Sequence, residues 1–128
     1  MGVFYVDCSV ANLAERERSA SIDQLLVDTG SEYTWLPSQI LTALGVDVEK
    51  PSRRFVMANG QVITRDIGYA ILKVDGFETV DEIVFAHKGD LSLLGSRTLE
   101  GFGAVIDATR KQLVTSGPRL AATPVLIK

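Results

Sequence analysis

Leu25-Leu-Val-Asp-Thr-Gly-Ser-Glu-Tyr-Thr-Trp-Leu36 is the stretch from which the rest of the chain is interpreted. Three apolar residues lead directly into Asp28-Thr29-Gly30, and β-forming residues return at Thr34-Trp35-Leu36. This pattern predicts a buried strand that stops at a tight turn and then resumes. A carboxylate at the end of a buried strand is costly unless it is paired, protonated or functional. Asp28 is therefore the first candidate for a functional residue.

The composition fits one domain of ordinary size, which we assign to residues 1–128. Hydrophobic residues make up 46% of the chain, enough for a core, and a mean hydropathy of +0.18 indicates some apolar surface buried between chains. The net charge of −3 and the pI of about 5.1 argue against nucleic-acid and anionic-membrane partners.

The sequence contains one cysteine, Cys8, and one histidine, His87. A single cysteine excludes an intrachain disulfide, and the two residues together cannot form a structural zinc site. We find no signal peptide and no segment long enough to span a membrane, so we expect a cytoplasmic protein or a domain of a larger one.

Short apolar segments separated by turn residues occupy most of the chain, which is typical of all-β domains. We expect strands at residues 3–6, 22–27, 55–58, 61–64, 69–74, 77–85, 91–95, 104–107 and 112–114. Asn59-Gly60, between two of these segments, is a strong signal for a two-residue hairpin turn. The predicted fold class is therefore all-β, a small closed barrel.

One or two short helices interrupt this β pattern. Apolar residues at helical spacing predict a helix at residues 38–44, which Gly45 ends. A single helical turn is expected to begin at Ser96 as its N-cap and to end at Gly101. Residues 115–128 are expected to form a connector whose apolar end pairs as a strand, in this chain or in another.

Motifs in a particular order along the chain resemble the retropepsin-like aspartic proteases, the single-domain relatives of the retroviral proteases. They are Asp-Thr-Gly-Ser at residues 28–31, the glycine-tipped hairpin at Ala58-Asn59-Gly60, and Leu93-Leu94-Gly95. The resemblance covers most of the chain, from the first strand to Val114. It implies a small closed barrel of the retropepsin type in a two-fold symmetric homodimer. The implied activity is cleavage of extended polypeptide segments, with no cofactor and no metal ion.

The resemblance also implies roles for individual residues. Asp28 would be the catalytic aspartate, and Thr29 would hydrogen-bond to the equivalent loop of the partner subunit. Gly30 would lie against the substrate backbone, and Ser31 stands where the family carries a small residue close to the carboxylate. Substrate-binding residues would be Ala58, Asn59 and Gly60 at the flap tip, with Tyr33, Trp35 and Leu93 in the pockets.

The chemistry of aspartic proteases explains why such a chain would dimerise. Two carboxylates must share one proton, because like charges a few ångströms apart cannot both ionise. The charged one draws a proton from water while the neutral one donates to the scissile carbonyl. This chain contains one Asp-Thr/Ser-Gly and so supplies half of a site. A homodimer would place Asp28 of each subunit on the two-fold axis, with residues 3–6 and 125–127 as candidate interface strands.

Two side-chain interactions are expected near this turn. The retroviral enzymes carry an arginine directly after the hydrophobic-hydrophobic-Gly motif, whereas Ser96 intervenes here and the arginine is Arg97. We expect Arg97 to pair with Glu32, the counterpart of the acidic residue that pairs with the arginine in those enzymes. We also expect the Ser31 hydroxyl to donate to the Asp28 carboxylate, which would lower the working pH.

Each of these interpretations has a simpler alternative. Asp28-Thr29-Gly30 is also compatible with a strand-ending turn, and Asn59-Gly60 with a plain hairpin. Tyr33 and Trp35 are equally compatible with core packing. A non-catalytic peptide-binding or dimerisation module on the same fold is the alternative function, because fold does not guarantee activity. A third possibility is one domain of a larger protein that dimerises weakly when alone.

Overall fold

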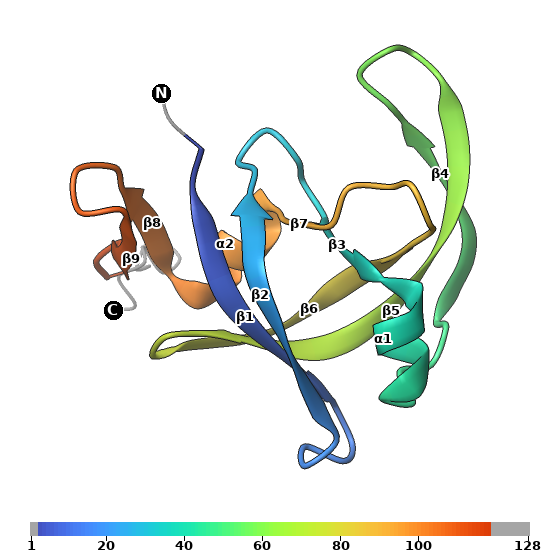
Figure 1. The fold of residues 1–128 in the computed structure, drawn as a ribbon, viewed down its shortest axis with the longest axis horizontal. Helices are drawn as coiled ribbons and strands as arrows, with labels where there is room; N and C mark the ends of the chain where they lie inside the picture. The colour runs from blue at the N-terminus through green and yellow to red at the C-terminus, as the bar shows by residue number, and fades with distance from the viewer. Residues whose placement is uncertain (1–2, 119–128) are drawn as a thin grey trace, which may run out of the picture.

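The computed structural model describes residues 3–118, which form nine strands and two short helices (Figure 1). In chain order the elements are β1 (Tyr5–Asn12), β2 (Ser19–Val27), β3 (Thr34–Pro37), α1 (Ser38–Ala43), β4 (Lys50–Val56), β5 (Val62–Val74), β6 (Phe77–Ala86), β7 (Leu93–Leu94), α2 (Ser96–Phe102), β8 (Ala104–Asp107) and β9 (Gln112–Thr115).

Six of the strands close into a barrel. Their order is β1-β2-β7-β3-β6-β5, and β5 pairs back to β1, which closes the ring. β4 also pairs with β5 and extends the sheet beyond the ring. β8 and β9 form a separate two-stranded sheet, at the opposite side of the molecule from the β4–β5 hairpin (Figure 1). The predicted closed, mostly β barrel with two short helices is confirmed.

The core fills the barrel because apolar residues alternate with polar ones along its strands. β5 and β6 pair continuously from Ile67↔Val84 to Val74↔Phe77. The largest side chains with less than 2% exposure include Leu25, Leu36, Leu41, Ile71, Leu72, Ile83 and Leu94, which come from five strands and from α1. Burial of such side chains is worth roughly 1.5–3 kcal/mol each. Asp28 follows a strand of this rigid ring.

A left-handed glycine follows the end of each helix. For α1 it is the predicted glycine, and for α2 it is a different one. α1 is followed by Gly45, which has a left-handed φ of 74°. α2 starts at Ser96, but its N-cap is Gly95, and the left-handed C-cap is Gly103 rather than Gly101. Gly101 lies inside the helix, at a position where a Cβ would lie 2.5 Å from Oγ1 of Thr79 on β6. Its glycine serves close packing, not termination.

The hairpin between β4 and β5 is longer than the predicted two-residue turn. The Met57 N–H donates to the Gln61 carbonyl and the Gly60 N–H donates to the Met57 carbonyl, both at 2.8 Å. Gly60 has a φ of 84°, whereas Asn59 is not left-handed. A turn over residues 57–60 whose last residue is a left-handed glycine is the common longer hairpin. A type I′ turn would require both central residues to be left-handed.

Cys8 lies in β1, with 2% of its surface exposed. Burial disfavours the thiolate and raises the pKa of Cys8 to about 12, although a backbone hydrogen bond from Lys73 acts in the opposite direction. Cys8 therefore packs in the core as a small buried hydrophobic residue.

The C-terminal prediction is tested only in part. β9 ends at Thr115, and both the N–H and the hydroxyl of Ser116 donate to the Gly103 carbonyl. The predicted apolar strand at residues 124–128 lies outside the described residues. Within residues 3–118, neither helix has the length and the apolar content needed to cross a lipid bilayer.

Candidate active site

The turn that carries Asp28 is held from behind by the short strand β7. β7 pairs parallel to β2 and antiparallel to β3, so it connects the strand before the turn with the strand after it. The Asp28 N–H donates to the Leu94 carbonyl at 2.9 Å. On the far side of the turn, the Ser96 N–H donates to the Ser31 carbonyl at 2.8 Å and the Arg97 N–H donates to the Glu32 carbonyl at 3.1 Å. Backbone hydrogen bonds therefore fix both arms of the loop.

The Asp28 carboxylate is positioned by its own turn. The Gly30 N–H donates to Oδ1 of Asp28 at 2.9 Å. A Cβ at residue 30 would lie 3.2 Å from the same oxygen, so a larger residue would crowd the carboxylate. Asp28 is half-buried, and Thr29 and Gly30 are exposed at the tip of the turn. One face of the carboxylate is thus held, while the tip stays accessible.

Ser31 does not interact as expected. Its hydroxyl donates to the carbonyl of Tyr33 at 3.0 Å and so does not donate to Asp28 in this structure. The prediction that Ser31 stabilises the charged carboxylate was wrong for this arrangement. The hydroxyl instead satisfies a carbonyl within the loop, which local hydrogen bonding of serine favours.

A buried chain of polar groups lies directly behind the loop. The Gly95 N–H donates to the Thr34 hydroxyl at 2.9 Å, and the hydroxyls of Thr34 and Thr98 are hydrogen-bonded to each other. Thr98 in turn donates to Oδ2 of Asp81 at 2.8 Å. Both threonines have 0% exposure. Each threonine hydroxyl then accepts one hydrogen bond and donates one, so all donors in this network point toward the Asp81 carboxylate. Every polar group of the network therefore has a hydrogen-bond partner.

Arg97 pairs with Glu82 and not with Glu32, so the predicted pair was wrong. Nη2 of Arg97 lies 3.2 Å from Oε1 of Glu82, and its guanidinium stacks over the Tyr33 ring with 4.9 Å to the centroid. Glu32 accepts the Arg97 backbone N–H through its own backbone carbonyl and forms no ion pair with the Arg97 side chain. The extra residue Ser96 places Arg97 within the first turn of α2, where its side chain reaches β6.

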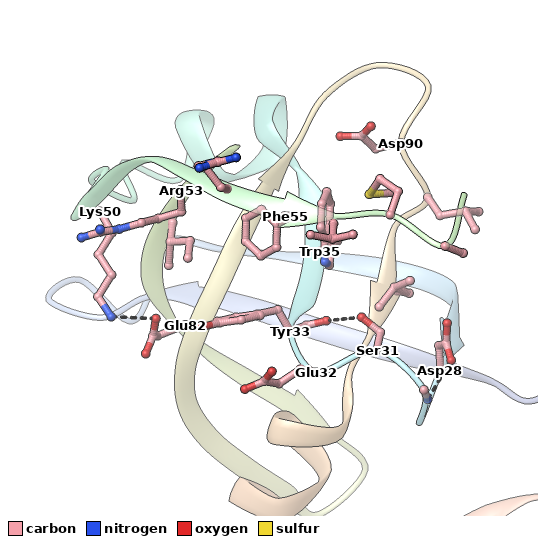
Figure 2. Close-up of a pocket in the computed structure, with 18 residues that line it drawn as sticks. Asp28, Ser31, Glu32, Tyr33, Trp35, Lys50, Arg53, Phe55, Glu82 and Asp90 are labelled. Atoms are coloured by element: carbon pink, nitrogen blue, oxygen red, sulfur yellow. Dashed lines mark hydrogen bonds and ion pairs between the residues drawn. The ribbon is translucent and has the colours of Figure 1, made fainter. Parts of the chain in front are cut away.

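A cleft of about 930 Å³ lies between the Asp28 loop and the β4–β5 hairpin (Figure 2). It is lined by Asp28, Gly30, Ser31, Glu32, Tyr33, Trp35, Lys50, Arg53, Arg54, Phe55, Val56, Met57, Ala58, Ile67, Glu82, Asp90, Leu91 and Leu93. Most residues predicted for the site are therefore brought together here.

Three predicted site residues lie elsewhere. Asn59 and Gly60 are exposed in the turn of the hairpin and do not line the cleft. Thr29 borders a separate recess of about 140 Å³ together with Val3 and Phe4. No residue that borders this recess also lines the cleft.

Sequence reasoning missed the β4 contribution to the cleft. Phe55 packs edge-on against Tyr33 and Trp35, with ring centroids 5.6 and 5.1 Å apart. Such pairs prefer this geometry. Trp35 is 8% exposed and belongs to the smaller core cluster, so it both packs and lines the cleft. Arg53 lies two positions before Phe55 in the same strand. Residues two positions apart in a strand share a face, and this spacing was the signal that could have placed both side chains together.

The outer wall of the cleft is held by an ion pair between Arg65 of β5 and Asp90 of the loop before β7. Nε and Nη2 of Arg65 donate to the two carboxylate oxygens at 2.7 and 2.9 Å. The side chains are 15% and 13% exposed. These bonds lower the pKa of Asp90, and the His87 N–H bond lowers it further.

Asp90→Asn should lower the free energy of unfolding by about 1–3 kcal/mol at pH 7, because it removes a two-point charged hydrogen bond. The folded-state pKa of Asp90 lies below the ordinary value of about 3.9, so the pair contributes above that value and its contribution is lost as the pH falls through the folded pKa. Urea unfolding at pH 7 and near pH 2 measures the difference, which should be smaller at the lower pH. A difference that is the same at both pH values would contradict this prediction, and the exposed Asp23→Asn serves as the control.

The described residues 3–118 contain no group of three or more His, Cys, Asp or Glu side chains arranged to hold a metal ion.

Comparison with known proteins assigns the family. The family model described as "gag-polyprotein putative aspartyl protease" matches residues 21–101, which is more than half of the chain and includes the Asp28 turn, the hairpin and β7. A comparison with curated protein sequences gives no significant match.

Among solved structures, the chain is similar to the retroviral protease-like domain of Ddi1 from Leishmania major. The TM-score is 0.60 at 15% sequence identity, and the match covers 92% of this chain and 91% of that chain. At this identity the likeness concerns the fold, and it agrees with the closed barrel described above. On the family match and this shared fold, the chain belongs to the retropepsin-like aspartyl protease family.

Proposed function

We propose that this protein is an aspartic endopeptidase that acts as a homodimer, with one Asp28 from each subunit. The observation that carries the proposal is the position of Asp28. Its half-buried carboxylate follows a barrel strand, accepts a hydrogen bond from its own turn and lines the same cleft as Ala58 of the β4–β5 hairpin.

The dimer follows from the chemistry. The chain contains one Asp-Thr-Gly, and hydrolysis by this mechanism needs two carboxylates that share a proton. The exposed tip at Thr29 and Gly30 leaves room for a second copy of the turn. The two aspartates then titrate as a coupled pair, so a pH profile of activity would report on the pair and not on either residue.

The reaction is general acid–base catalysis on water. The ionised Asp28 accepts a proton from the water, and the water oxygen bonds to the scissile carbonyl carbon. The protonated Asp28 of the partner subunit donates to the carbonyl oxygen, which gives a neutral tetrahedral diol. Proton transfer to the amide nitrogen then breaks the C–N bond and releases an amine and a carboxylic acid. The Gly30 N–H holds the carboxylate orientation through these steps.

The substrate would bind as an extended strand between the loop and the hairpin. Backbone hydrogen bonds would supply affinity, and side chains that alternate along the peptide would enter pockets on either side. Tyr33, Trp35, Phe55 and Leu93 line the cleft and are largely apolar. We therefore expect apolar residues on both sides of the cleaved bond.

The test combines inhibition with concentration dependence. A peptide that carries a statine residue mimics the tetrahedral diol, and it should inhibit cleavage of the matched substrate peptide. Activity per chain should rise with protein concentration until the dimer is fully formed, as measured by sedimentation on the same samples. A well-folded dimer that cleaves nothing across a wide pH range would instead support the non-catalytic peptide-binding module. Per-chain activity that is constant in a purely monomeric sample would refute the shared site.

A further inference from the structure

We propose that the end of the cleft remote from Asp28 binds an acidic side chain of the peptide, through Lys50 and Arg53 of β4. The inference rests on the proposed binding of an extended peptide in this cleft. It adds a charged specificity position to a site whose other contacts are apolar. We refer to the part of the cleft lined by Lys50, Arg53, Arg54 and Glu82 as the basic end.

The basic end is built around one carboxylate that is shared by two cations. Nζ of Lys50 lies 2.9 Å from Oε2 of Glu82, and Nη2 of Arg97 lies 3.2 Å from Oε1. Both carboxylate oxygens are therefore occupied, and the Glu82 side chain is only 13% exposed. Hydrogen bonding to Lys50 holds the pKa of Glu82 low, so Glu82 remains charged at neutral pH.

The cations keep donors free for another anion. The side chains of Lys50 and Arg97 are 35% and 34% exposed, so neither is fully enclosed by its contact with Glu82. Arg53 lines the cleft, is exposed and has no acidic partner among residues 3–118. Two cations thus hold the inner carboxylate, and Arg53 adds a third positive charge from β4.

The remaining charges of the neighbourhood do not cancel this excess. Glu32 also lines the cleft, and Arg54 adds a further exposed cation from β4. Asp90 is already paired with Arg65 through both of its oxygens. Three cations, Lys50, Arg53 and Arg54, therefore line this end of the cleft with Glu82 and Glu32, and Glu82 is also paired with Arg97. A carboxylate brought by the substrate would reduce the imbalance. In a partly enclosed cleft such charge pairs count for more than on an open surface.

The geometry places this position several residues away from the cleaved bond. Figure 2 shows Lys50, Arg53 and Glu82 at one end of the cleft and Asp28 at the other, with Tyr33 between them. Arg53 stands three residues before Val56, the last residue of β4, which corresponds to roughly 10 Å along the strand. A bound peptide is extended in the same way, so the acidic residue should lie about three to five residues from the scissile bond.

The experiment scans one charge through one peptide. A fluorescent peptide with an uncharged, apolar centre carries Glu, Gln or Lys at each position in turn, and its binding to the full chain with Asp28→Asn is followed by anisotropy. At one position remote from the centre, Glu should bind about fivefold more tightly than Gln, and Lys more weakly than Gln. The Glu preference should decline as salt is raised, because the charges are partly exposed to solvent.

Variants locate the effect. Arg53→Gln should reduce the Glu-to-Gln affinity ratio, and Arg53→Gln with Lys50→Gln should bring it close to one. Arg16→Gln is the matched control, since Arg16 lies at the distant β1–β2 turn, pairs with Glu78 and carries the same charge. The control should keep the full ratio. Equal binding of Glu and Gln at every position, no binding by any peptide, or a ratio unchanged in the double variant would each overturn the proposal.

Cleavage of the same peptides by the unmodified protein separates this inference from the proposed function. Cleavage without any preference for the acidic residue would refute the acidic-residue subsite and support the proposed protease activity. Selective binding of the acidic peptide without cleavage of any peptide would support the subsite and refute the proposed protease activity.

Discussion

Asp28→Asn should abolish peptide cleavage, lowering kcat/KM by at least about a thousandfold. An amide cannot accept the proton of the attacking water, and in a homodimer the substitution removes both carboxylates of the pair at once. The fold should persist, because the asparagine Oδ1 can still accept the Gly30 N–H that holds Asp28. The measurement is the rate of cleavage of a peptide substrate, with unfolding by urea recorded on the same preparation.

A matched substitution in the same strand controls for general effects. Asp23→Asn makes the same chemical change at an exposed position of β2, five residues before Asp28, and should leave kcat/KM unchanged. Proteolysis that survives intact in Asp28→Asn would end the assignment of Asp28 as the catalytic residue. A loss of activity together with a loss of cooperative unfolding would point to a structural role instead.

Gly95→Ala should lower the free energy of unfolding by about 3 kcal/mol or more, because the site has no space for a methyl group. A Cβ on Gly95 would lie 2.7 Å from the Glu32 carbonyl oxygen and closer still to the Tyr33 carbonyl. These are backbone atoms of the loop that carries Asp28, so they can yield only if the loop moves. The backbone of Gly95 is extended, with a φ of −93°, so the cost comes from space and not from conformation.

Urea denaturation of Gly95→Ala measures this loss, and peptide cleavage tests whether the displaced loop also lowers activity. Gly76→Ala is the control, since a Cβ there meets nothing within 4 Å, and its unfolding free energy should change by less than about 0.5 kcal/mol. Unaltered stability in Gly95→Ala would show that the loop and β7 can separate without cost, contrary to their close packing here.

Local patterns were enough to predict much of this fold. The apolar run before Asp28, the return at Thr34, the helix after Pro37 and the hairpin after β8 all depend on neighbouring residues. The residue that ends a helix is harder to predict from neighbouring residues alone. Gly101 and Gly103 both qualify as a helix end, and in the structure Gly103 adopts the left-handed C-cap while Gly101 packs close to Thr79 inside the helix.

Side-chain partners were predicted less well, because they depend on which strands become neighbours. Arg97 pairs with Glu82 because α2 packs beside β6, and Ser31 turns to the Tyr33 carbonyl because the loop folds back on itself. Phe55 joins Tyr33 and Trp35 only because β4 crosses the cleft above β3. None of these contacts has a signature in the spacing of residues along the chain.

The sequence by itself determined the family motif, the mostly β character and the turn that presents Asp28, since these arise from apolar periodicity and from residues adjacent in the chain. Tertiary structure alone decided how the turn is held. β7 joins both arms of the loop, and the buried hydrogen-bond chain from Gly95 through Thr34 and Thr98 to Asp81 links residues up to 64 positions apart. Buried polar groups must find partners, and closing the barrel determines which partners are within reach.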